Sequence, residues 1–219
     1  MPRPIEALIH AEALTHNLGI ARARAGGARV WAVVKANAYG HGLISTALCL
    51  ADADAFAVAR IDEALALRGA GVSKPIVLLE GVFSAEQLAE AARQNLEIVI
   101  HEEEQLALLE RNVGSHRFVV WLKIDTGMNR LGFPASSVVA ALDRIAALGD
   151  RLHEIRLMTH FACADERDSV LTARQMALFA QLTHGRTASR SLANSAAIFA
   201  QRDAHADADH RRVERVAPG

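Results

Sequence analysis

Residues 30–42 of the chain read Val-Trp-Ala-Val-Val-Lys-Ala-Asn-Ala-Tyr-Gly-His-Gly. The residues before the lysine form an unbroken apolar run, which is typical of a parallel strand covered on both faces. Lys35 follows at the end of this run, and Gly40 and Gly42 close a short loop. The segment therefore predicts a buried strand that presents an amine at its carboxyl end.

Comparable apolar runs recur along the chain, separated by stretches with helical periodicity. We predict strands at 30–34, 55–59, 76–79, 96–100, 118–124, 154–159 and 190–192. We predict helices at about 11–25, 61–70, 102–111, 134–149 and 168–184, and a further helix that begins at Ser84. Repeated β-α units predict a (β/α)8 TIM-type barrel or a doubly wound sheet. The first strand is not followed by GxGxxG, which argues against a dinucleotide-binding sheet.

The two ends of the chain depart from this alternation. Within residues 1–10, the segment 5–9 predicts an orphan N-terminal strand, and residues 11–200 form the predicted barrel. Residues 201–219 are rich in Arg and Asp and contain no Leu, Ile, Phe, Met, Trp or Tyr. We therefore expect an aberrant polar tail that supplies no buried eighth strand, so that the barrel is incomplete at its last strand.

Composition excludes several classes of function. Lys and Arg number 24 and Asp and Glu 25, so the net charge of −1 gives no electrostatic reason to bind nucleic acid or an anionic membrane. The apolar runs are far shorter than the ~20 residues that a membrane span needs. The start of the chain does not resemble a signal peptide, and the two cysteines, Cys49 and Cys163, do not make a disulfide scaffold. We therefore expect a cytoplasmic protein.

Two interpretations of Lys35 follow from its place at a strand end. In a β/α barrel the carboxyl ends of the strands face the active site. An amine held there against apolar side chains becomes available as a nucleophile for a Schiff base. The alternative is a surface lysine beside glycines that serve only as turn residues.

A second polar cluster follows the strand predicted at 118–124. Lys123 and Asp125 are two residues apart on a strand and therefore share a face. Arg130 follows a glycine-containing loop and can turn back over the same strand end. These charges predict an anion or cofactor site, and the alternative is an ordinary ion-pair cluster worth about 0–1 kcal/mol.

Two further strand ends carry candidate ligand-binding residues. His160 either stacks on a flat ring or is a structural histidine. With Cys163 it resembles half of a zinc site, but no second pair has ligand spacing, and we predict no metal. Asn194 and Ser195 stand where a short strand opens a helix, a place that suits a phosphate or needs only a plain N-cap.

Taken together, these segments resemble alanine racemase, a pyridoxal-phosphate enzyme of the (β/α)8-barrel type. The motifs are VVKANAYGHG at 33–42, LKIDTGMNRLGF at 122–133, MTHFACADE at 158–166 and LANSAA at 192–197. The resemblance runs from about residue 3 to residue 200. It implies pyridoxal 5'-phosphate as cofactor and the interconversion of L-alanine and D-alanine, which supplies D-alanine for peptidoglycan or degrades it.

The resemblance also implies a role for each residue. Lys35 would form an aldimine with the cofactor and act as the base on one face of the α-carbon. Tyr39 would help to hold the cofactor phosphate. Arg130 would bind the phenolic oxygen of the cofactor and lie near the substrate carboxylate. Lys123 matches a lysine that is carbamylated in many members, and the carbamate would orient Arg130.

The remaining carried-over roles concern the ring and the phosphate of the cofactor. His160 would pack near the pyridine ring, and Asn194 and Ser195 would contact the phosphate. The cofactor ring takes up the electrons left by the α-proton, and the protein chooses the face to which the proton returns.

The sequence departs from the family in two respects. Racemisation needs a second base, which in the family is a tyrosine from a C-terminal β domain of the other subunit of a homodimer. This chain has one tyrosine, Tyr39, and no such domain. The family also carries a WVRPG-like strand, and here Ala217 occupies the place of its arginine, with Arg215 out of register. We therefore expect a truncated or frameshifted product with little racemase turnover.

Two alternative functions remain open. One is a barrel-only carrier that binds pyridoxal phosphate without racemase activity, although the lysine loops of such carriers do not read KANAYGHG. The other is a different barrel-type pyridoxal enzyme, such as an amino-acid decarboxylase or a racemase of broader specificity.

Overall fold

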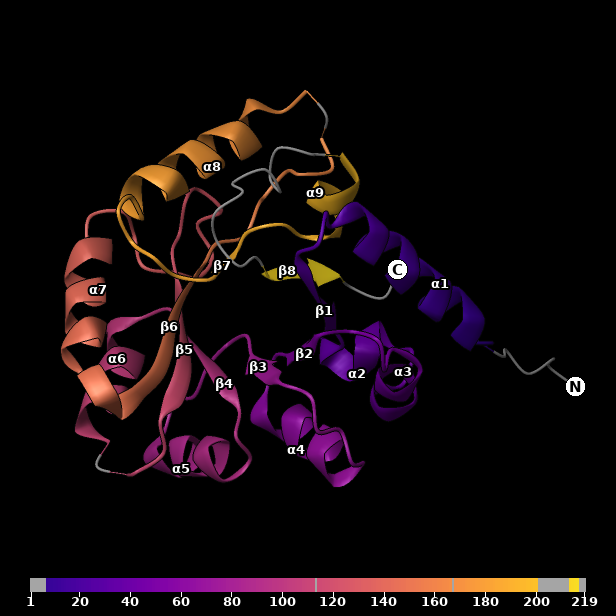
Figure 1. Ribbon diagram of the computed structural model, residues 1–219, viewed down its shortest axis with the longest axis horizontal. Helices are drawn as coiled ribbons and strands as arrows, with labels where there is room; N and C mark the ends of the chain where they lie inside the picture. The colour runs from indigo at the N-terminus through magenta and orange to yellow at the C-terminus, as the bar shows by residue number, and fades with distance from the viewer. Residues whose placement is uncertain (1–6, 113, 167, 201–212, 217–219) are drawn as a thin grey trace, which may run out of the picture.

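A computed structural model describes residues 7–112, 114–166, 168–200 and 213–216. Its centre is an eight-stranded sheet with the order β7-β6-β5-β4-β3-β2-β1-β8, in which every pairing is parallel. The strands are β1 Arg29–Val33, β2 Ala55–Val58, β3 Ile76–Leu78, β4 Glu97–Ile100, β5 Phe118–Lys123, β6 Leu152–Met158, β7 Arg190–Ser191 and β8 Val213–Val216. Figure 1 shows the strands curling around a common centre with helices outside them. The predicted β/α barrel is confirmed.

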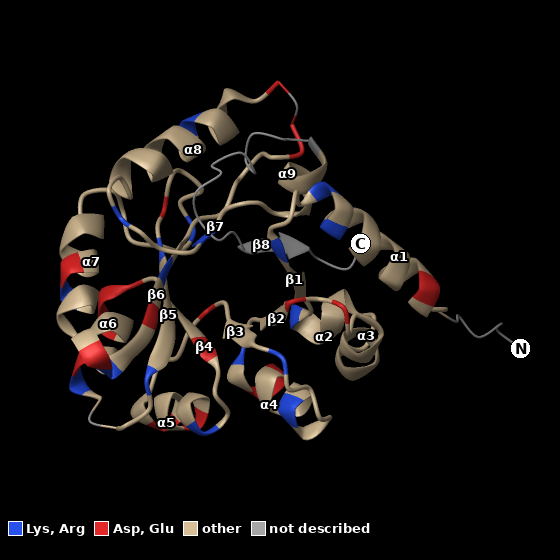
Figure 2. Ribbon diagram, in the orientation of Figure 1, with Lys and Arg blue, Asp and Glu red and all other residues tan. Residues whose placement is uncertain are grey.

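Helices connect the strands in the predicted alternation. They are α1 Ala11–Arg24, α2 Lys35–Tyr39, α3 Leu43–Cys49, α4 Ile61–Gly69, α5 Ala85–Arg93, α6 Glu103–Arg111, α7 Val138–Ala147, α8 Val170–Leu182 and α9 Ser195–Ala200, with a 3-10 turn at Gly149–Arg151. Figure 2 shows acidic and basic residues interspersed along α4 to α7. Among the described residues, no helix has both the length and the apolar character needed to cross a membrane.

Local capping explains where two of the helices begin. Ser84 caps α5, because its hydroxyl oxygen accepts a hydrogen bond from the N–H of Gln87 at 3.2 Å. The helix predicted at 134–149 begins later, as α7, because a turn in which Ser137 N–H bonds the carbonyl of Pro134 precedes it.

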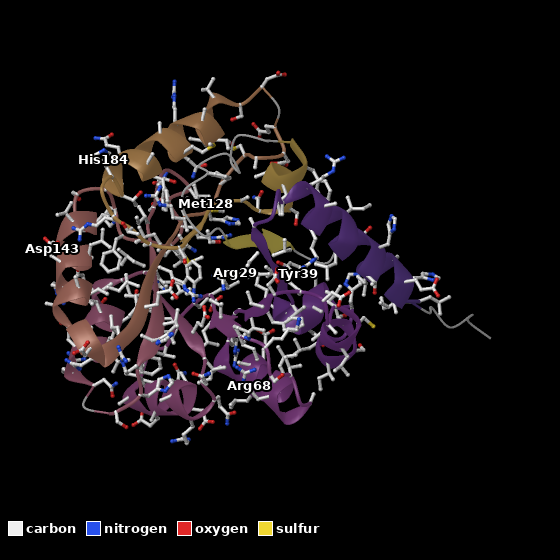
Figure 3. All side chains as sticks on the ribbon, viewed as in Figure 1. Arg29, Tyr39, Arg68, Met128, Asp143 and His184 are labelled. Carbon is white, nitrogen blue, oxygen red and sulfur yellow. The ribbon has the colours of Figure 1, made fainter. Side chains whose placement is uncertain are left out.

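The barrel interior is filled by side chains that alternate with those facing the helices. Val30 and Ala32 pack in the cluster between sheet and helices, whereas Trp31 and Val33 pack in a separate inner cluster. The ring of Trp31 meets that of Trp121 edge-on, with centroids 4.6 Å apart. Figure 3 shows side chains crowding the space inside the sheet. The interior is therefore a packed core, and any ligand site lies at its rim.

The structure corrects part of each prediction about the ends of the chain. Residues 7–9 form no strand, because they have no pairing partner among the described residues, and Leu8 and Ile9 are exposed. Residues 5 and 6 lie outside the described part. The tail does contain a strand, β8, which pairs with β1. Among the described strands β8 does not pair with β7, so the sheet stays open between them, and the predicted incomplete barrel is confirmed. Parallel pairing uses backbone groups, and two valines supply β propensity without larger apolar residues. Residues 201–212 and 217–219 lie outside the described part.

Candidate active site

The residues after Lys35 adopt an unusual backbone conformation. Ala36, Asn37, Ala38 and Tyr39 all have φ between 52° and 56°, so the short α2 segment turns in the left-handed sense. For residues with a side chain this conformation costs roughly 1–2 kcal/mol each, and such strain is concentrated at functional sites. Nothing in the local sequence pattern indicated this turn.

Hydrogen bonds from outside the turn hold it in place. The N–H of Asn37 donates to the carboxylate of Glu63, on α4, at 3.4 Å. The side-chain oxygen of Asn37 accepts from the N–H of Leu43 at 2.8 Å and so begins α3. Ala38 is fully buried between these elements. The loop that carries Lys35 is therefore fixed on both sides.

A cavity of about 410 Å³ opens at the rim formed by the carboxyl ends of the strands. It is lined by Val33, Lys35, Tyr39, Leu79, Glu80, Lys123, Arg130, Leu131, His160, Asn194 and Ser195. Every candidate cofactor-binding residue from the sequence, and Lys123, is among them. They come from the ends of β1, β5, β6 and β7, and Tyr39 is labelled in Figure 3. Residues far apart in the chain thus meet at one site, as the barrel topology predicts.

The charges around the cavity favour an anionic ligand. Lys35, Lys123 and Arg130 are cationic, whereas Glu80 is the one acidic residue in the lining. Lys123 is 6% exposed, so its side chain lies within the protein rather than in solvent. Like-signed groups in a concave site raise the local concentration of oppositely charged ligands.

His101 lies beside this cluster and had no role in the sequence analysis. Burial lowers the pKa of His101, and the positive charge of Lys123 lowers it further, whereas Glu102 and the carbonyl of Glu80 oppose the shift. Its Nε2 lies 3.1 Å from the carbonyl oxygen of Glu80, so this nitrogen carries the proton of the neutral ring. His101 is therefore a neutral neighbour of the Lys123 side chain near pH 7.

Asp125 does not belong to the cavity, contrary to the prediction of a shared charged face with Lys123. Its carboxylate accepts hydrogen bonds from the N–H groups of Gly127 at 2.9 Å and Asn129 at 3.0 Å. When an Asp carboxylate accepts from the N–H groups that follow it, the backbone turns and the strand ends. Asp125 therefore shapes the loop that carries Arg130.

Two glycine-dependent contacts fix the ends of these loops. Gly132 has φ +131°, and a Cβ there would lie 2.6 Å from the backbone nitrogen of Asp125. Gly81 has φ +71°, and a Cβ there would lie 2.2 Å from the carbonyl oxygen of Val99. Both positions require glycine because the backbones approach too closely for a side chain.

The loop after β6 is held by Gln175, a residue that the sequence analysis missed. The buried amide of Gln175, on α8, donates to the carbonyl of His160 at 3.0 Å and accepts from the N–H of Ala162 at 3.0 Å. The sequence shows Gln175 as a polar residue within a predicted helix. Residue type alone does not tell whether such a residue faces the core or the solvent.

Asn194 caps the start of α9, which was one of its two predicted roles, beside phosphate binding. Its side-chain oxygen accepts from the N–H of Ala197 at 3.0 Å, and its amide donates to the carbonyl of Phe161 at 3.5 Å. Asn194 and Ser195 nevertheless line the cavity. Within the described residues, no group of three or more His, Cys, Asp or Glu side chains is placed to hold a metal ion.

Comparison with known proteins identifies the family. The family model described as alanine racemase, N-terminal domain, matches residues 9–213. The chain belongs to the alanine racemase family. It is 50% identical to the alanine racemase of Azoarcus sp. strain BH72, over 94% of this chain and 58% of that protein. It is 48% identical to the alanine racemase of Aeromonas hydrophila, over 92% of this chain and 56% of that protein.

Solved structures of racemases share the fold. The biosynthetic alanine racemase of Pseudomonas aeruginosa superposes with a TM-score of 0.87 at 39% identity, covering 94% of this chain and 56% of that one. A histidine racemase from Leuconostoc mesenteroides superposes with a TM-score of 0.79 at 27% identity, covering 94% and 56%. The chain thus spans little more than half the length of these relatives. The resemblance drawn from the sequence motifs is confirmed at the level of the family.

Proposed function

We propose that this chain is the cofactor-binding barrel of an alanine racemase that uses pyridoxal 5'-phosphate to interconvert L-alanine and D-alanine. The observation that carries the proposal is the convergence of Lys35, Arg130, His160 and Ser195 on one cavity at the strand ends. The family match supports the same activity. In a cell the reaction would supply or degrade cytoplasmic D-alanine, a component of peptidoglycan.

The residues around the cavity fit a phosphorylated aldehyde. An amine, Lys35, stands at the rim to react with the aldehyde, and the excess of cationic groups suits a dianionic phosphate. The volume of about 410 Å³ falls in the range of roughly 300–1,000 Å³ that is usual for small-molecule sites. When bound, pyridoxal phosphate supplies an aldehyde that condenses with an amine and a ring that takes up the electrons left by an α-proton.

In this proposal Lys35 has two tasks. Its amine would hold the cofactor, and it would also carry the proton at one face of the alanine α-carbon. The left-handed turn at 36–39 supports both tasks, because it holds the lysine at the rim without a flexible linker. Tyr39 lies on the same turn, where its hydroxyl is a donor for the phosphate.

Arg130, Lys123 and His160 orient the reactants. The guanidinium of Arg130 binds the phenolic oxygen of the cofactor and attracts the alanine carboxylate. Lys123 adds CO2 to form a carbamate with loss of one proton, and the resulting negative charge orients Arg130. The imidazole of His160 would pack against the pyridine ring. Asn194 and Ser195 complete the phosphate site from the start of α9.

A proton carrier on the opposite face of the α-carbon is also needed for racemisation. Tyr39 is the single tyrosine of the sequence, and it lies on the Lys35 turn, where the proposal already assigns it to the phosphate. We therefore propose that the second base belongs to a part of the whole protein beyond these 219 residues, contributed across a homodimer.

Cofactor attachment to Lys35 tests the proposal directly. The 219-residue chain is incubated with pyridoxal phosphate, reduced with borohydride and digested, and the modified lysine is located by mass spectrometry. We expect the label on Lys35 and a visible absorbance that Lys35→Ala abolishes. Lys74→Arg is the matched control, because Lys74 donates to the carbonyl of Ala53 away from the cavity. Equal binding by Lys35→Ala and the parent contradicts the proposal.

Proton exchange separates the proposed racemase from the alternatives. With one base present, we expect the loaded chain to exchange the α-proton of one alanine enantiomer in D2O while producing little of the other. Cofactor binding and delivery to an apo-enzyme, with no exchange on either enantiomer, would favour a carrier. Release of CO2 from an amino acid without α-exchange would favour a decarboxylase.

A further inference from the structure

The amide of Gln175 is fully buried and uses both of its polar ends. Its nitrogen donates to the carbonyl oxygen of His160 at 3.0 Å and to the hydroxyl of Thr126 at 3.2 Å. Its oxygen accepts from the N–H of Ala162 at 3.0 Å. Two donors and one acceptor are therefore satisfied, as a buried amide requires.

These contacts hold the His160 loop on both sides of Phe161, at the carbonyl of His160 and the N–H of Ala162. The neighbouring backbone groups are also bound from outside the loop, since Thr159 N–H donates to the carbonyl of Ser191 at 3.0 Å. His160 is thus held through its main chain, whereas its ring lines the cavity. With the backbone fixed, few directions remain for the ring, because side-chain rotamers depend on local φ and ψ.

The same amide reaches the loop that follows β5. Thr126, its hydroxyl partner, lies 2.8 Å from the hydroxyl of Thr159, and both threonines are buried. The loop that begins there carries Arg130 into the cavity. Gln175 therefore connects the two strand ends that present Arg130 and His160, from a helix on the outer side of the sheet (Figure 1).

We propose that Gln175 is a positioning residue of the cofactor site, which sets the orientation of His160 through the backbone of residues 160–162. The proposal rests on the proposed function, because it assumes that the ligand of the cavity is pyridoxal phosphate. Gln175 itself does not line the cavity. Two of its three hydrogen bonds go to the backbone of the His160 loop and one to the hydroxyl of Thr126, so the proposal assigns its effect on the cofactor to His160 rather than to Arg130.

Gln105, on α6, provides a matched comparison elsewhere in the barrel. It is 2% exposed, donates to the carbonyl of Glu80 at 2.7 Å and accepts from the N–H of His101 at 2.9 Å. It therefore joins the ends of β3 and β4 as Gln175 joins those of β5 and β6. Its hydrogen bonds go to His101 and Glu80 and not to His160 or Thr126, so its loss should disturb the fold without reaching His160.

The test is a double-mutant cycle on cofactor affinity in the 219-residue chain. The dissociation constant for pyridoxal phosphate is measured by visible absorbance for the parent, Gln175→Met, His160→Ala and the double variant. The same cycle is run with Gln105→Met in place of Gln175→Met. Thermal unfolding without cofactor is recorded for every variant, and methionine is chosen because it has nearly the shape of glutamine.

We expect both glutamine variants to unfold at lower temperature, because each leaves buried backbone groups unpaired. Gln175→Met should weaken cofactor binding about tenfold when His160 is present, but by no more than about twofold in the His160→Ala background. Gln105→Met should have the same effect on affinity in both backgrounds. Gln175→Glu keeps the acceptor for Ala162 and removes the donors, so it repeats the test if Gln175→Met does not fold.

Two results would overturn the inference, and they differ in meaning. Cofactor binding by the parent together with equal effects of Gln175→Met in both backgrounds removes the positioning role and leaves the proposed function intact. Failure of the parent to bind pyridoxal phosphate through Lys35 removes the proposed function, and the positioning role falls with it.

Discussion

The guanidinium of Arg156 lies 3.0 Å from each carboxylate oxygen of Glu97 inside the barrel. Glu97 also accepts the indole N–H of Trp121 at 2.7 Å, and Arg156 lies over the ring of that tryptophan. Both charged side chains are 11% exposed. The ion pair thus closes the inner core at the end opposite to the cavity, where β4 begins at Glu97.

Neutralising Glu97 should therefore destabilise the fold. Glu97→Gln keeps an acceptor for Trp121 but leaves the buried charge of Arg156 with less compensation, so we expect a loss of about 3 kcal/mol in the free energy of unfolding. Glu103→Gln is the control, because Glu103 pairs with Arg144 on the surface and such pairs contribute about 0–1 kcal/mol. Urea unfolding of both variants measures the difference, and equal losses would contradict the role given to the buried pair.

A side chain at Gly132 should damage the Arg130 loop. Gly132→Ala combines φ +131° with a Cβ 2.6 Å from the backbone of Asp125, so we expect a loss of about 1–3 kcal/mol of stability and weaker cofactor binding. Gly19→Ala is the opposite case, since it lies within α1 and a Cβ there meets nothing within 4 Å. That variant should gain about 0.5–1 kcal/mol. Chemical denaturation gives both values.

At the left-handed turn we expect a glycine substitution to raise the stability rather than lower it. Ala36→Gly removes the Cβ penalty at φ 52° and should stabilise the chain by about 0.5–1 kcal/mol after the entropic cost of glycine is subtracted. Ala66→Gly, at an exposed position of the regular helix α4, should instead destabilise it by about 1 kcal/mol. A loss of stability in Ala36→Gly, measured by thermal unfolding, would show that this backbone is not strained.

Burial of His101 predicts a dependence of stability on pH. Its pKa is lowered in the folded state, so the unfolded chain binds more protons below the unperturbed value of about 6.5. The contribution of neutral His101 to the free energy of unfolding is complete above about pH 6.5 and is lost as the pH falls toward the lowered pKa. His101→Gln should flatten the dependence of the free energy of unfolding on pH below about pH 6.5, as measured by urea unfolding. An unchanged slope would rule out His101 as the source, leaving His116, whose pKa burial also lowers.

Much of the fold follows from periodicity that is visible in the sequence. The runs that became β1, β2 and β5 are apolar at almost every position because both faces of a parallel strand are covered. The convergence of the candidate residues on one cavity was also readable, since Lys35 and His160 stand at strand ends and the carboxyl ends of parallel strands share one rim. Asp125 was misassigned because spacing on a strand does not say where the strand ends.

Local pattern by itself determined the order of strands and helices, the place of Lys35 and the membership of the family. Only the tertiary structure decided the left-handed turn after Lys35, the pairing of β8 with β1 and the hydrogen bonds of Gln175 to the His160 loop. The physical reason is the same in each case. Burial preferences repeat along the chain and can be read there, whereas these features depend on hydrogen bonds between backbone and polar groups that only folding brings together.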